Sequence, residues 1–269
     1  MDIKEVEQHY TITQLNNFME ASYDGWNVKE IKFLNIALST IQKEDKELKT
    51  QYIKATNIAR LLKVKKLDYS TLEKFCEDLH KKQIKVKFYN EEIKKYSFKL
   101  FHWFSTFEYS NGIIAFKFDK NIEPFLLSLK DKLSIYKLEN ILPLKSKYSI
   151  QIYMFLKRMV KVGYRKISVD NFCEILNIDK NSTNHTNKYL KARVLEPAVK
   201  ELIRKTDLTF DYRIKKTKDS RIANMILFTI YSDNSYDTFM TNTQHMTGSQ
   251  MVQNYKEYCK IMFDDWKGD

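Results

Sequence analysis

The sequence predicts an α+β protein built from two tandem winged-helix domains related by internal duplication. Two observations predict this class. Helical apolar stripes alternate with aromatic and β-branched runs in the order helix, strand, helix, helix, hairpin, and this order occurs twice in 269 residues. Landmarks of the two copies also recur at similar offsets, since Ile58 and Phe172 are 114 residues apart and Thr71 and Lys188 are 117 apart.

The first copy opens with a helix over NVKEIKFLNIALSTIQ, where Asn27 and Glu30 have the spacing of a capping box and apolar residues form one stripe. A strand at QYIKA follows, and Thr56 is the expected cap of the next short helix. Ser70 and Glu73 predict a second capping box at the start of a further helix. Two short helices in succession predict a helix-turn-helix.

Strands come after these helices. The runs KVKFYN, SFKLFHWFSTFEY and GIIAFKF are rich in aromatic and β-branched residues, and Asn111-Gly112 predicts a tight hairpin turn between the last two. The segment NIEPFLLSLKDK then predicts the helix that ends the first copy.

The second copy begins with the segment IYKLENILPLKSKYSIQIYMFLKRMVK. This segment predicts a short helix, a break at Pro143 and a long amphipathic helix over 147–161. RKISV is the expected strand, and helices are expected over 170–176 and 188–205. Pro197 predicts a kink in the last helix because proline removes a backbone hydrogen bond. Alternating apolar residues on both sides of a polar tip predict the closing hairpin.

These elements divide the chain into four expected parts. They are an N-terminal segment (1–26), a first winged-helix domain (27–131), a second one (132–231) and a C-terminal tail (232–269), with the junction of the two domains near 131–146. Each domain has its own apolar stripes and hairpin, so each is expected to fold independently.

Basic residues are concentrated in the second copy. The chain carries a net charge of +12; residues 134–231 hold 20 Lys+Arg against 9 Asp+Glu, whereas residues 24–131 hold 21 against 15 and both ends are acidic. A basic centre is the expected footprint of a protein that binds nucleic acid, although such a surface also suits anionic lipid or protein.

Catalysis, a metal and a cofactor are not expected. There is no glycine-rich phosphate loop, the five histidines never form a His-x-His pair, and no Cys-x-x-Cys occurs among the three cysteines. A tyrosine nucleophile held beside a metal, as in strand-nicking initiators, is therefore disfavoured. We see no signal peptide and no apolar run of membrane-spanning length, so a cytoplasmic protein is expected.

The helix over 188–205 is the best candidate for reading DNA, because the N-terminal part of the second helix meets base edges in helix-turn-helix proteins. The tip KKTKDSR of the closing hairpin suits phosphate contacts, which position a protein more than they select sequence. The expected DNA-binding residues are Asn187, Lys188, Lys191, Arg193, Lys200, Lys215, Lys216, Lys218 and Arg221, with Lys74, Lys81 and Lys82 as a weaker set in the first copy. Two alternatives remain open: a merely solvated basic face, and helix capping by Asn184, Thr186 and Asn187.

The ordered set of SKYSIQIYMFLKR, VLEPAVKELI and the strand after Thr206-Asp207 resembles the iteron-binding initiators of theta-type plasmid replication. The resemblance covers roughly residues 28–231. It implies two winged-helix domains that bind double-stranded direct repeats at a bacterial plasmid origin, with the second domain supplying most of the readout and the first also a dimerisation surface. It further implies origin opening, recruitment of host helicase or initiator proteins by the monomer, and copy control by a homodimer.

Two other classes stay open on the sequence alone. A winged-helix transcriptional regulator without a replication role has the same fold and charge. A structural or membrane-surface adaptor predicts lipid binding and no sequence preference on DNA.

Overall fold

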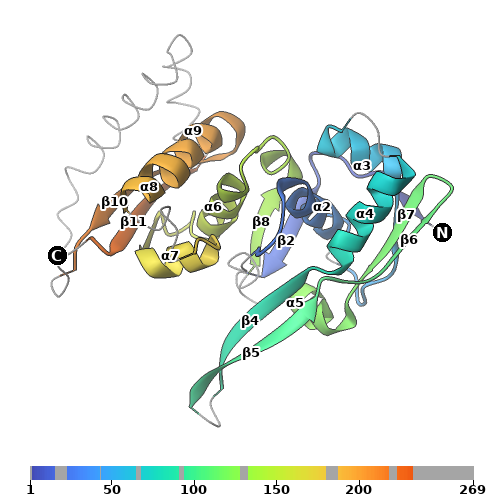
Figure 1. Ribbon diagram of the computed structural model, residues 1–269, viewed down its shortest axis with the longest axis horizontal. Coiled ribbons are helices and arrows are strands. Elements are labelled where there is room, and N and C mark those ends of the chain that lie inside the picture. The colour runs from blue at the N-terminus through green and yellow to red at the C-terminus, as the bar shows by residue number, and fades with distance from the viewer. Residues whose placement is uncertain are drawn as a thin grey trace. The chain divides into compact units, whose positions relative to one another are not determined.

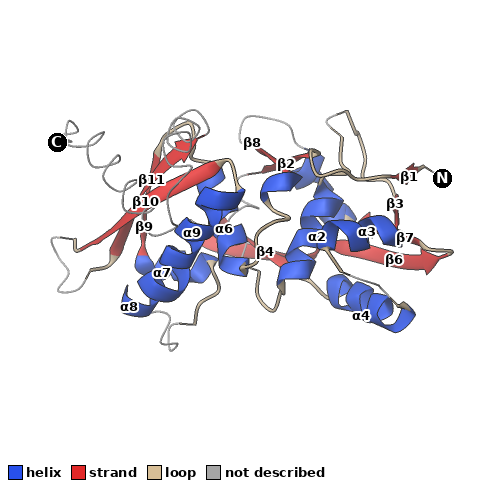
Figure 2. Ribbon diagram, turned by 90° about the horizontal axis from the view of Figure 1, so that it is seen from above, coloured by secondary structure: helices blue, strands red, loops and turns tan. Residues whose placement is uncertain are grey.

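The computed structural model describes residues 2–15, 23–42, 44–64, 68–90, 94–127, 133–179, 187–217 and 223–232. The chain divides into two compact units, Met1–Lys147 (unit 1) and Tyr148–Asp269 (unit 2). In each of them, helices accompany a sheet whose strands are mostly antiparallel (Figure 1 and Figure 2).

Unit 1 has a winged-helix core in which one strand is central. Its elements are α2 (Val28–Leu38), β3 (Gln51–Lys54), α3 (Ala55–Leu62), α4 (Tyr69–His80), β6 (Phe104–Ser110) and β7 (Ile113–Phe118). Strand β7 pairs antiparallel with both β3 and β6. The ring of Phe33 on α2 contacts Phe104 and Phe116 at centroid distances of 6.0 and 5.6 Å, so the helix packs on an aromatic sheet face.

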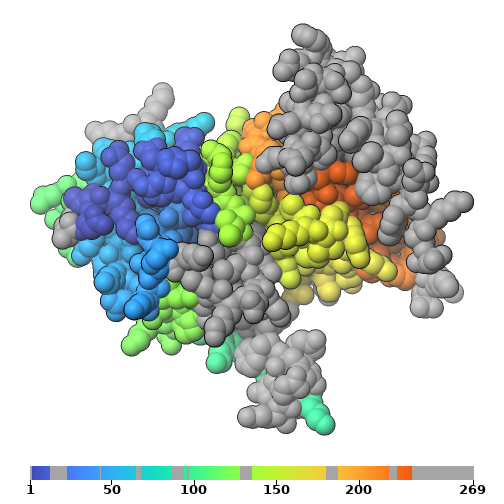
Figure 3. All heavy atoms as spheres, turned by 180° about the vertical axis from the view of Figure 1, so that it is seen from behind, coloured from blue at the N-terminus to red at the C-terminus, as the bar shows by residue number. Residues whose placement is uncertain are grey.

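Unit 2 repeats this arrangement. Its elements are α6 (Lys147–Lys157), β9 (Tyr164–Ser168), α7 (Val169–Ile175), α8 (Asn187–Tyr189), η4 (Leu190–Leu195), α9 (Glu196–Lys205), β10 (Leu208–Lys215) and β11 (Met225–Ser232). Strand β11 pairs antiparallel with β9 and β10. Phe228 on β11 contacts Phe155, Phe172 and Phe210 at 5.9, 5.2 and 5.7 Å, and Figure 3 shows the yellow atoms of α7 beside the orange-red strands.

The predicted duplication is confirmed in the backbone of the first helix pair, at the predicted offset of 114 residues. Strand β3 and helix α3 correspond to β9 and α7, and both helices end at a residue with positive φ, Lys63 (54°) and Asn177 (55°). In both, the next amide closes the turn: Val64 N donates to Ala59 O at 3.0 Å, and Ile178 N donates to Cys173 O at 2.8 Å. This is the left-handed C-terminal cap of a helix.

The second helices correspond at a larger offset than the sequence predicts. The buried Leu72 and Leu79 of α4 match the buried Leu195 and Leu202 in the segments LEKFCEDL and LEPAVKEL, 123 residues apart. The predicted match of Thr71 with Lys188 is therefore wrong, because the helix of unit 2 begins earlier, with α8 and η4, than α4 does.

Unit 1 carries two additions to the shared core. A two-stranded ribbon, β4 (Gln83–Asn90) and β5 (Lys95–His102), is inserted between α4 and β6 and pairs with no other strand of the described residues (Figure 1). The N-terminal segment contributes β1 (Ile3–Lys4), parallel to β3, and β2 (Thr11–Leu15), antiparallel to β8 (Leu133–Lys137). Asn57 fixes this segment, since its side chain accepts from Val6 N at 3.0 Å and donates to Val6 O at 3.1 Å.

The expected junction is packed into unit 1 where the structure describes it. Strand β8 pairs with β2, and the buried Tyr136 hydroxyl donates to Asn35 Oδ1 on α2 at 2.8 Å. Beyond it lie η2 (Leu138–Asn140) and the fully buried Ile141 and Leu144. The four domain ranges stay predictions, but residues 133–144 contribute to the core of the first unit.

Several predicted element boundaries hold and others do not. The capping box of Asn27 and Glu30 is confirmed, and Asn111 and Gly112 have the positive φ angles of the predicted tight turn. The predicted cap at Thr56 is wrong, since α3 begins after Lys54 and without a side-chain cap. The capping box of Ser70 and Glu73 is also wrong, because Asp68 caps α4 by accepting from Thr71 N at 2.9 Å.

Longer predicted elements are interrupted. The run 97–109 forms two strands, because Trp103 leaves the sheet and is buried. The helix expected over 121–132 is η1 (Lys120–Ile122) followed by α5 (Glu123–Leu127), and its remainder lies outside the described residues. Helix α6 ends at Lys157 rather than 161. Of the predicted tail, only residue 232 is described, as the last residue of β11.

Candidate nucleic-acid interface

The helix formed by α8, η4 and α9 separates its apolar and basic side chains. Its buried residues are Leu190, Val194, Leu195, Ala198, Leu202 and Ile203, which include the predicted inner stripe. Its exposed residues are Lys188, Lys191, Ala192, Arg193, Pro197, Lys200 and Arg204. Five of these seven are cations and none is acidic, so the solvent-facing side of this helix is strongly basic.

The kink expected at Pro197 takes the form of a wide turn just before it. Segment η4 is π-helical, and the amide of Glu196 donates to Lys191 O, five residues back. Proline cannot donate to the residue four back and its ring crowds that carbonyl, so a wider turn relieves the clash. Three consecutive residues of this segment, Lys191 to Arg193, are all exposed.

Tyr189 organises the cations around this turn. The guanidinium of Arg193 lies 4.5 Å from the centre of the Tyr189 ring, and the Lys188 ammonium lies 6.0 Å from it. Both arrangements are cation–π contacts. Sequence reasoning missed Tyr189, although the spacing of four residues between it and Arg193 is the spacing at which helix side chains meet.

Asn187 joins the start of the helix to the closing hairpin. Its Nδ2 donates to Ala223 O at 2.6 Å. Asn224 bonds Thr217 across the loop end of this hairpin: its Oδ1 accepts from Thr217 N at 3.1 Å and its Nδ2 donates to Thr217 Oγ1 at 3.2 Å. The structure thus gives the Asn187 amide a positioning role, and its contact with a base stays a prediction.

The hairpin of β10 and β11 supplies the other predicted cations of unit 2. Lys215 is the last residue of β10, Lys216 follows it, and both side chains are exposed. Lys218 and Arg221 lie outside the described residues. The described part of this hairpin therefore places two lysines near Ala223, whose carbonyl oxygen accepts from Asn187 at the start of the basic helix.

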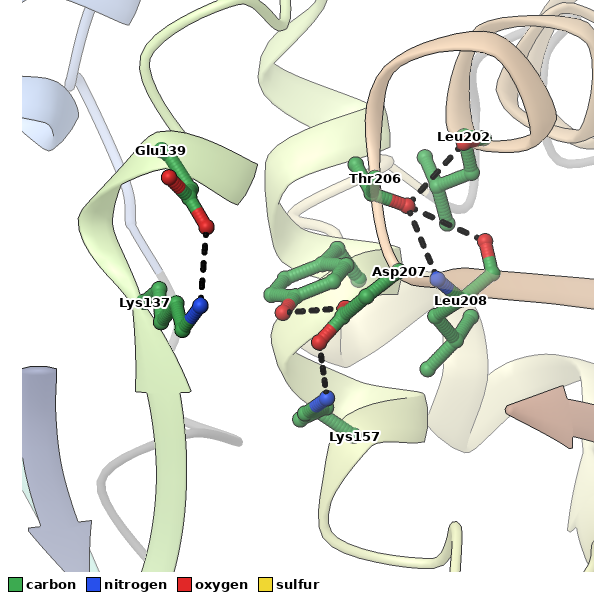
Figure 4. Close-up of polar contacts among 8 residues, drawn as sticks. Lys137, Glu139, Lys157, Leu202, Thr206, Asp207 and Leu208 are labelled. Carbon is green, nitrogen blue, oxygen red and sulfur yellow. Dashed lines mark hydrogen bonds and ion pairs between the residues drawn. The ribbon is translucent and has the colours of Figure 1, made fainter. Parts of the chain in front are cut away.

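The Thr206-Asp207 pair bonds to the end of α9, the start of β10 and helix α6 (Figure 4). Thr206 Oγ1 donates to Leu202 O at 3.0 Å and accepts from Leu208 N at 3.2 Å, which ends α9 and starts β10. Asp207 accepts from the Tyr153 hydroxyl at 2.9 Å and from Lys157 Nζ at 2.5 Å, both on α6. Lys157 is accordingly a structural cation, only 16% exposed.

The acidic residues of the same helix are occupied. Glu196 Oε1 accepts from the Tyr212 hydroxyl of β10 at 3.1 Å, and Glu201 Oε1 accepts from Lys205 Nζ at 2.6 Å. Burial and the neighbouring Glu196 charge raise the pKa of Tyr212 above its ordinary value, so the hydroxyl keeps its proton and remains a donor. These contacts hold both carboxylates off the exposed basic side.

The three lysines of unit 1 that were predicted to contact DNA, Lys74, Lys81 and Lys82, lie among acidic residues. Lys81 forms an exposed ion pair with Glu77 at 3.6 Å, and the exposed Lys74 is followed by Asp78 on the same helix. Lys82 is 16% exposed, with its ammonium 3.0 Å from Glu30 and 2.6 Å from Gly25 O. Lys82 therefore serves the fold of unit 1, which weighs against the predicted DNA contact there.

Among the described residues, no group of three or more His, Cys, Asp or Glu side chains has the arrangement of a metal site. In the same part of the chain, every helix is too short or too polar to cross a lipid bilayer. Cys76 and Cys173 are free thiols, and burial raises the pKa of each to about 11.

Comparison with known protein families gives two matches. Residues 11–157 match the family model described as "Initiator Replication protein, WH1", and residues 168–230 match "Initiator Rep protein, WH2". The first of these alone covers more than half of the chain.

Individual relatives agree with the family. A replication initiation protein of Escherichia coli is 27% identical over 201 residues, covering 72% of this chain and 58% of the relative. A probable replication protein of Bifidobacterium longum (strain NCC 2705) is 32% identical over 104 residues, 39% of this chain and 34% of the relative. The chain thus aligns with less than two thirds of either relative.

Among solved structures, the Pi initiator protein in complex with iteron DNA superposes with a TM-score of 0.67 at 22% identity, covering 85% of this chain and 99% of that one. This similarity is one of fold.

Proposed function

Because the chain belongs to the family of initiator replication proteins with WH1 and WH2 domains, we propose that it initiates plasmid replication by binding direct repeats in double-stranded origin DNA. The observation that carries the proposal is the charge segregation on α8, η4 and α9, whose exposed residues include five cations and no acid. Family membership also favours a replication role over the transcriptional regulator that the sequence left open.

In the proposed complex, the front of this helix enters the major groove. Arg193 and Lys191 are the residues proposed to meet base edges, since an arginine can bind guanine with two hydrogen bonds. The Tyr189 ring supports this role for Arg193 by restricting the guanidinium before DNA arrives. Lys188 and Lys200 extend the basic face on the two sides of the π-helical turn.

The hairpin is proposed to bind the phosphate backbone. Lys215 and Lys216 are exposed there, and Asn187 couples the hairpin loop to the helix, so a phosphate contact at one fixes the register of the other. Lys218 and Arg221 are proposed to add to the same contact. Lys74 and Lys81 of unit 1 are proposed as secondary phosphate contacts.

Assembly beyond DNA is also part of the proposal. We infer a homodimer formed through unit 1, copy control by that dimer, and recruitment of host helicase or initiator proteins at the opened origin. The proposal assigns no chemical step to the chain, and places it in the bacterial cytoplasm.

Affinity for the direct repeats beside the gene, against scrambled duplex, tests the proposal. If about six phosphates are neutralised, log K against log salt should fall with a slope near −5, following roughly 0.9 per phosphate. A replicon that lacks its own initiator should be sustained by this protein together with its repeats. Equal affinity for repeats and scrambled duplex, or a flat salt response, would contradict the proposal.

A further inference from the structure

Unit 1 contains an open groove between α4 and β6 that the proposed function does not use. Its volume is about 730 Å³, and Leu72, Cys76 and Phe107 are its apolar lining. One end is bounded by Tyr69 and Tyr109, whose rings are 6.0 Å apart, and both tyrosines are exposed. Burial raises the pKa of Cys76 to about 11, so its thiol stays protonated and contributes as an apolar group.

The groove runs along the edge strand of the sheet, where Ser105 O lies 3.2 Å from Nε2 of His80. In the described part of unit 1 the sheet order is β1-β3-β7-β6, which leaves β6 at the border. All five residues from Ser105 to Tyr109 line the groove. Since successive strand side chains point to opposite faces, such a continuous run means that the edge itself opens into the groove. An edge of this kind offers backbone donors and acceptors to an added strand.

Three of the four charged residues that line the groove are acidic, and His80 also lines it. Glu73 and Glu77 of α4 and Glu108 of β6 all line it, while Lys81, which also lines it, is paired with Glu77 one helical turn away. This is unusual for a chain of net charge +12. Carboxylates on the lining repel phosphate, so the groove disfavours nucleic acid and favours a cationic ligand.

Unit 2 has a side-chain hydrogen bond at the place that corresponds to this groove. Register places Phe107 opposite Phe116 and Tyr212 opposite Phe228, and the two pairs occupy the same place in the duplicated sheets. The Tyr212 hydroxyl binds Glu196, whereas Phe107 has no hydroxyl to offer the matching Glu73. Among the described residues, Glu73 and Glu108 have no hydrogen-bond or ion-pair partner.

We propose that this groove docks an extended, basic segment of another protein, which adds as a strand to β6 and places Lys or Arg side chains against Glu73, Glu77 and Glu108. An apolar side chain of the segment fills the space between Leu72 and Phe107. Charge argues against two other occupants: a second copy would oppose its own carboxylates, and the C-terminal residues 232–269 of this chain have a net charge of −3.

A displayed library of random ten-residue peptides, panned on the full-length protein, tests the proposal without knowledge of the partner. Selected peptides should carry Lys or Arg at alternate positions around an aromatic or aliphatic residue. Their synthetic versions should bind Glu73→Lys/Glu108→Lys at least about five-fold more weakly, which corresponds to two surface charge contacts. N-methylation of alternate backbone amides in the peptide should abolish binding, because it blocks strand pairing.

Matched controls separate this proposal from the DNA-binding one. Glu47→Lys reverses another exposed glutamate of unit 1, paired with Lys49 at 3.6 Å, and should leave peptide affinity unchanged. Affinity of the Glu73→Lys/Glu108→Lys variant for repeat DNA should be equal or greater, which also shows that the variant is folded. If repeat DNA is not bound by the unaltered protein, the proposed function fails while the peptide result stands.

Three outcomes would overturn the groove proposal. One is that panning enriches no peptide, and another is that the selected peptides bind Glu73→Lys/Glu108→Lys as tightly as the unaltered protein. The third is that the two substitutions change only self-association in sedimentation, which would make a second copy the occupant.

Discussion

Replacement of Tyr189 by leucine should reduce sequence discrimination on DNA while leaving general affinity nearly unchanged. In the structure, the ring lies 4.5 Å from the guanidinium of Arg193 one helical turn away, and none of the exposed residues from 187 to 205 is acidic. The substitution keeps an apolar side chain of helix-favouring type, so the fold of the helix should survive. Tyr189→Phe keeps the ring and is the matched control.

The expected size follows from the contact. An exposed cation–π pair contributes about 0.5–1 kcal/mol, which is roughly a two- to five-fold loss on the repeat at 1.4 kcal/mol per decade. Arg193→Ala removes the base contact itself and should cost about 1–3 kcal/mol. If the ring acts only through Arg193, adding Tyr189→Leu to Arg193→Ala should cost almost nothing further, so the coupling energy should nearly equal the single-mutant loss.

The assay is a fluorescence anisotropy titration of the five proteins (unaltered, Tyr189→Leu, Tyr189→Phe, Arg193→Ala and the double variant) on one repeat and on scrambled duplex at fixed salt. Tyr189→Leu should bind the repeat two- to five-fold more weakly and scrambled duplex equally well, whereas Tyr189→Phe should match the unaltered protein on both. Additive losses in the double variant, or equal losses on the two duplexes, would refute the reasoning that Tyr189 positions a base-reading arginine.

Other perturbations have distinct expected signatures. Lys216→Ala should weaken binding to all duplexes alike and reduce the salt slope by about one; a change of sequence preference would move readout to the hairpin. Asp207→Ala leaves the ammonium of Lys157 without its acceptor and should lower the free energy of unfolding by about 2–3 kcal/mol in urea titrations, with a Tyr153→Phe control losing less. A fragment of residues 146–232 should fold and bind one repeat about a hundred-fold more weakly than the full chain, because linkage makes the second contact intramolecular; equal affinity would exclude unit 1 from the DNA. Burial raises the pKa of Cys173 to about 11, above the ordinary value of 9.0, so its stabilising contribution is complete below pH 9 and is lost as pH rises through 11; in Cys173→Ala the urea midpoint should depend less on pH in that window.

The parts of the fold that the sequence predicts correctly depend on local chemistry. The capping box at Asn27 joins groups three residues apart, and the turn at Asn111-Gly112 needs only two residues that tolerate positive φ. The internal duplication is also readable, because both copies keep the order of their apolar stripes. The left-handed caps at Lys63 and Asn177 show how closely the first helices correspond.

Other features depend on partners distant in sequence. Strand β2 pairs with β8 across more than one hundred residues, and the two-residue β1 is too short to give a periodic signal. Ser70 is three residues before Glu73, which is the spacing of a capping box, yet Asp68 is the residue that caps α4. Both residue types can cap a helix, and their spacing alone does not show which one does. The sequence alone suggests that Lys82 is a surface cation, whereas in the structure its ammonium pairs with the buried Glu30.

For the candidate site, the sequence correctly predicts the apolar side of the basic helix but not the geometry at its turn. Pro197 is a visible signal for irregularity, and the structure resolves it as a π-helical segment that exposes three consecutive residues. The hydrogen bond from Asn187 to Ala223 joins residues 36 positions apart, so it could not be inferred from the sequence. The contact of Tyr189 with Arg193 could have been predicted, because residues four apart on a helix lie close together.

The two copies have kept one scaffold and divided its surfaces. In LEKFCEDL and LEPAVKEL the buried leucines match, but Glu77 of unit 1 stands where Lys200 stands in unit 2. Phe107 of unit 1 similarly stands where unit 2 has Tyr212, whose hydroxyl donates to Glu196. Both differences act in the same direction: unit 2 is basic and has a hydrogen bond between sheet and helix at this place, whereas unit 1 is acidic there and has an open groove. Since a lone charge change on a solvated helix costs little, whereas an open groove exposes apolar surface, the absence of that hydroxyl from unit 1 is the stronger sign that this groove has an occupant.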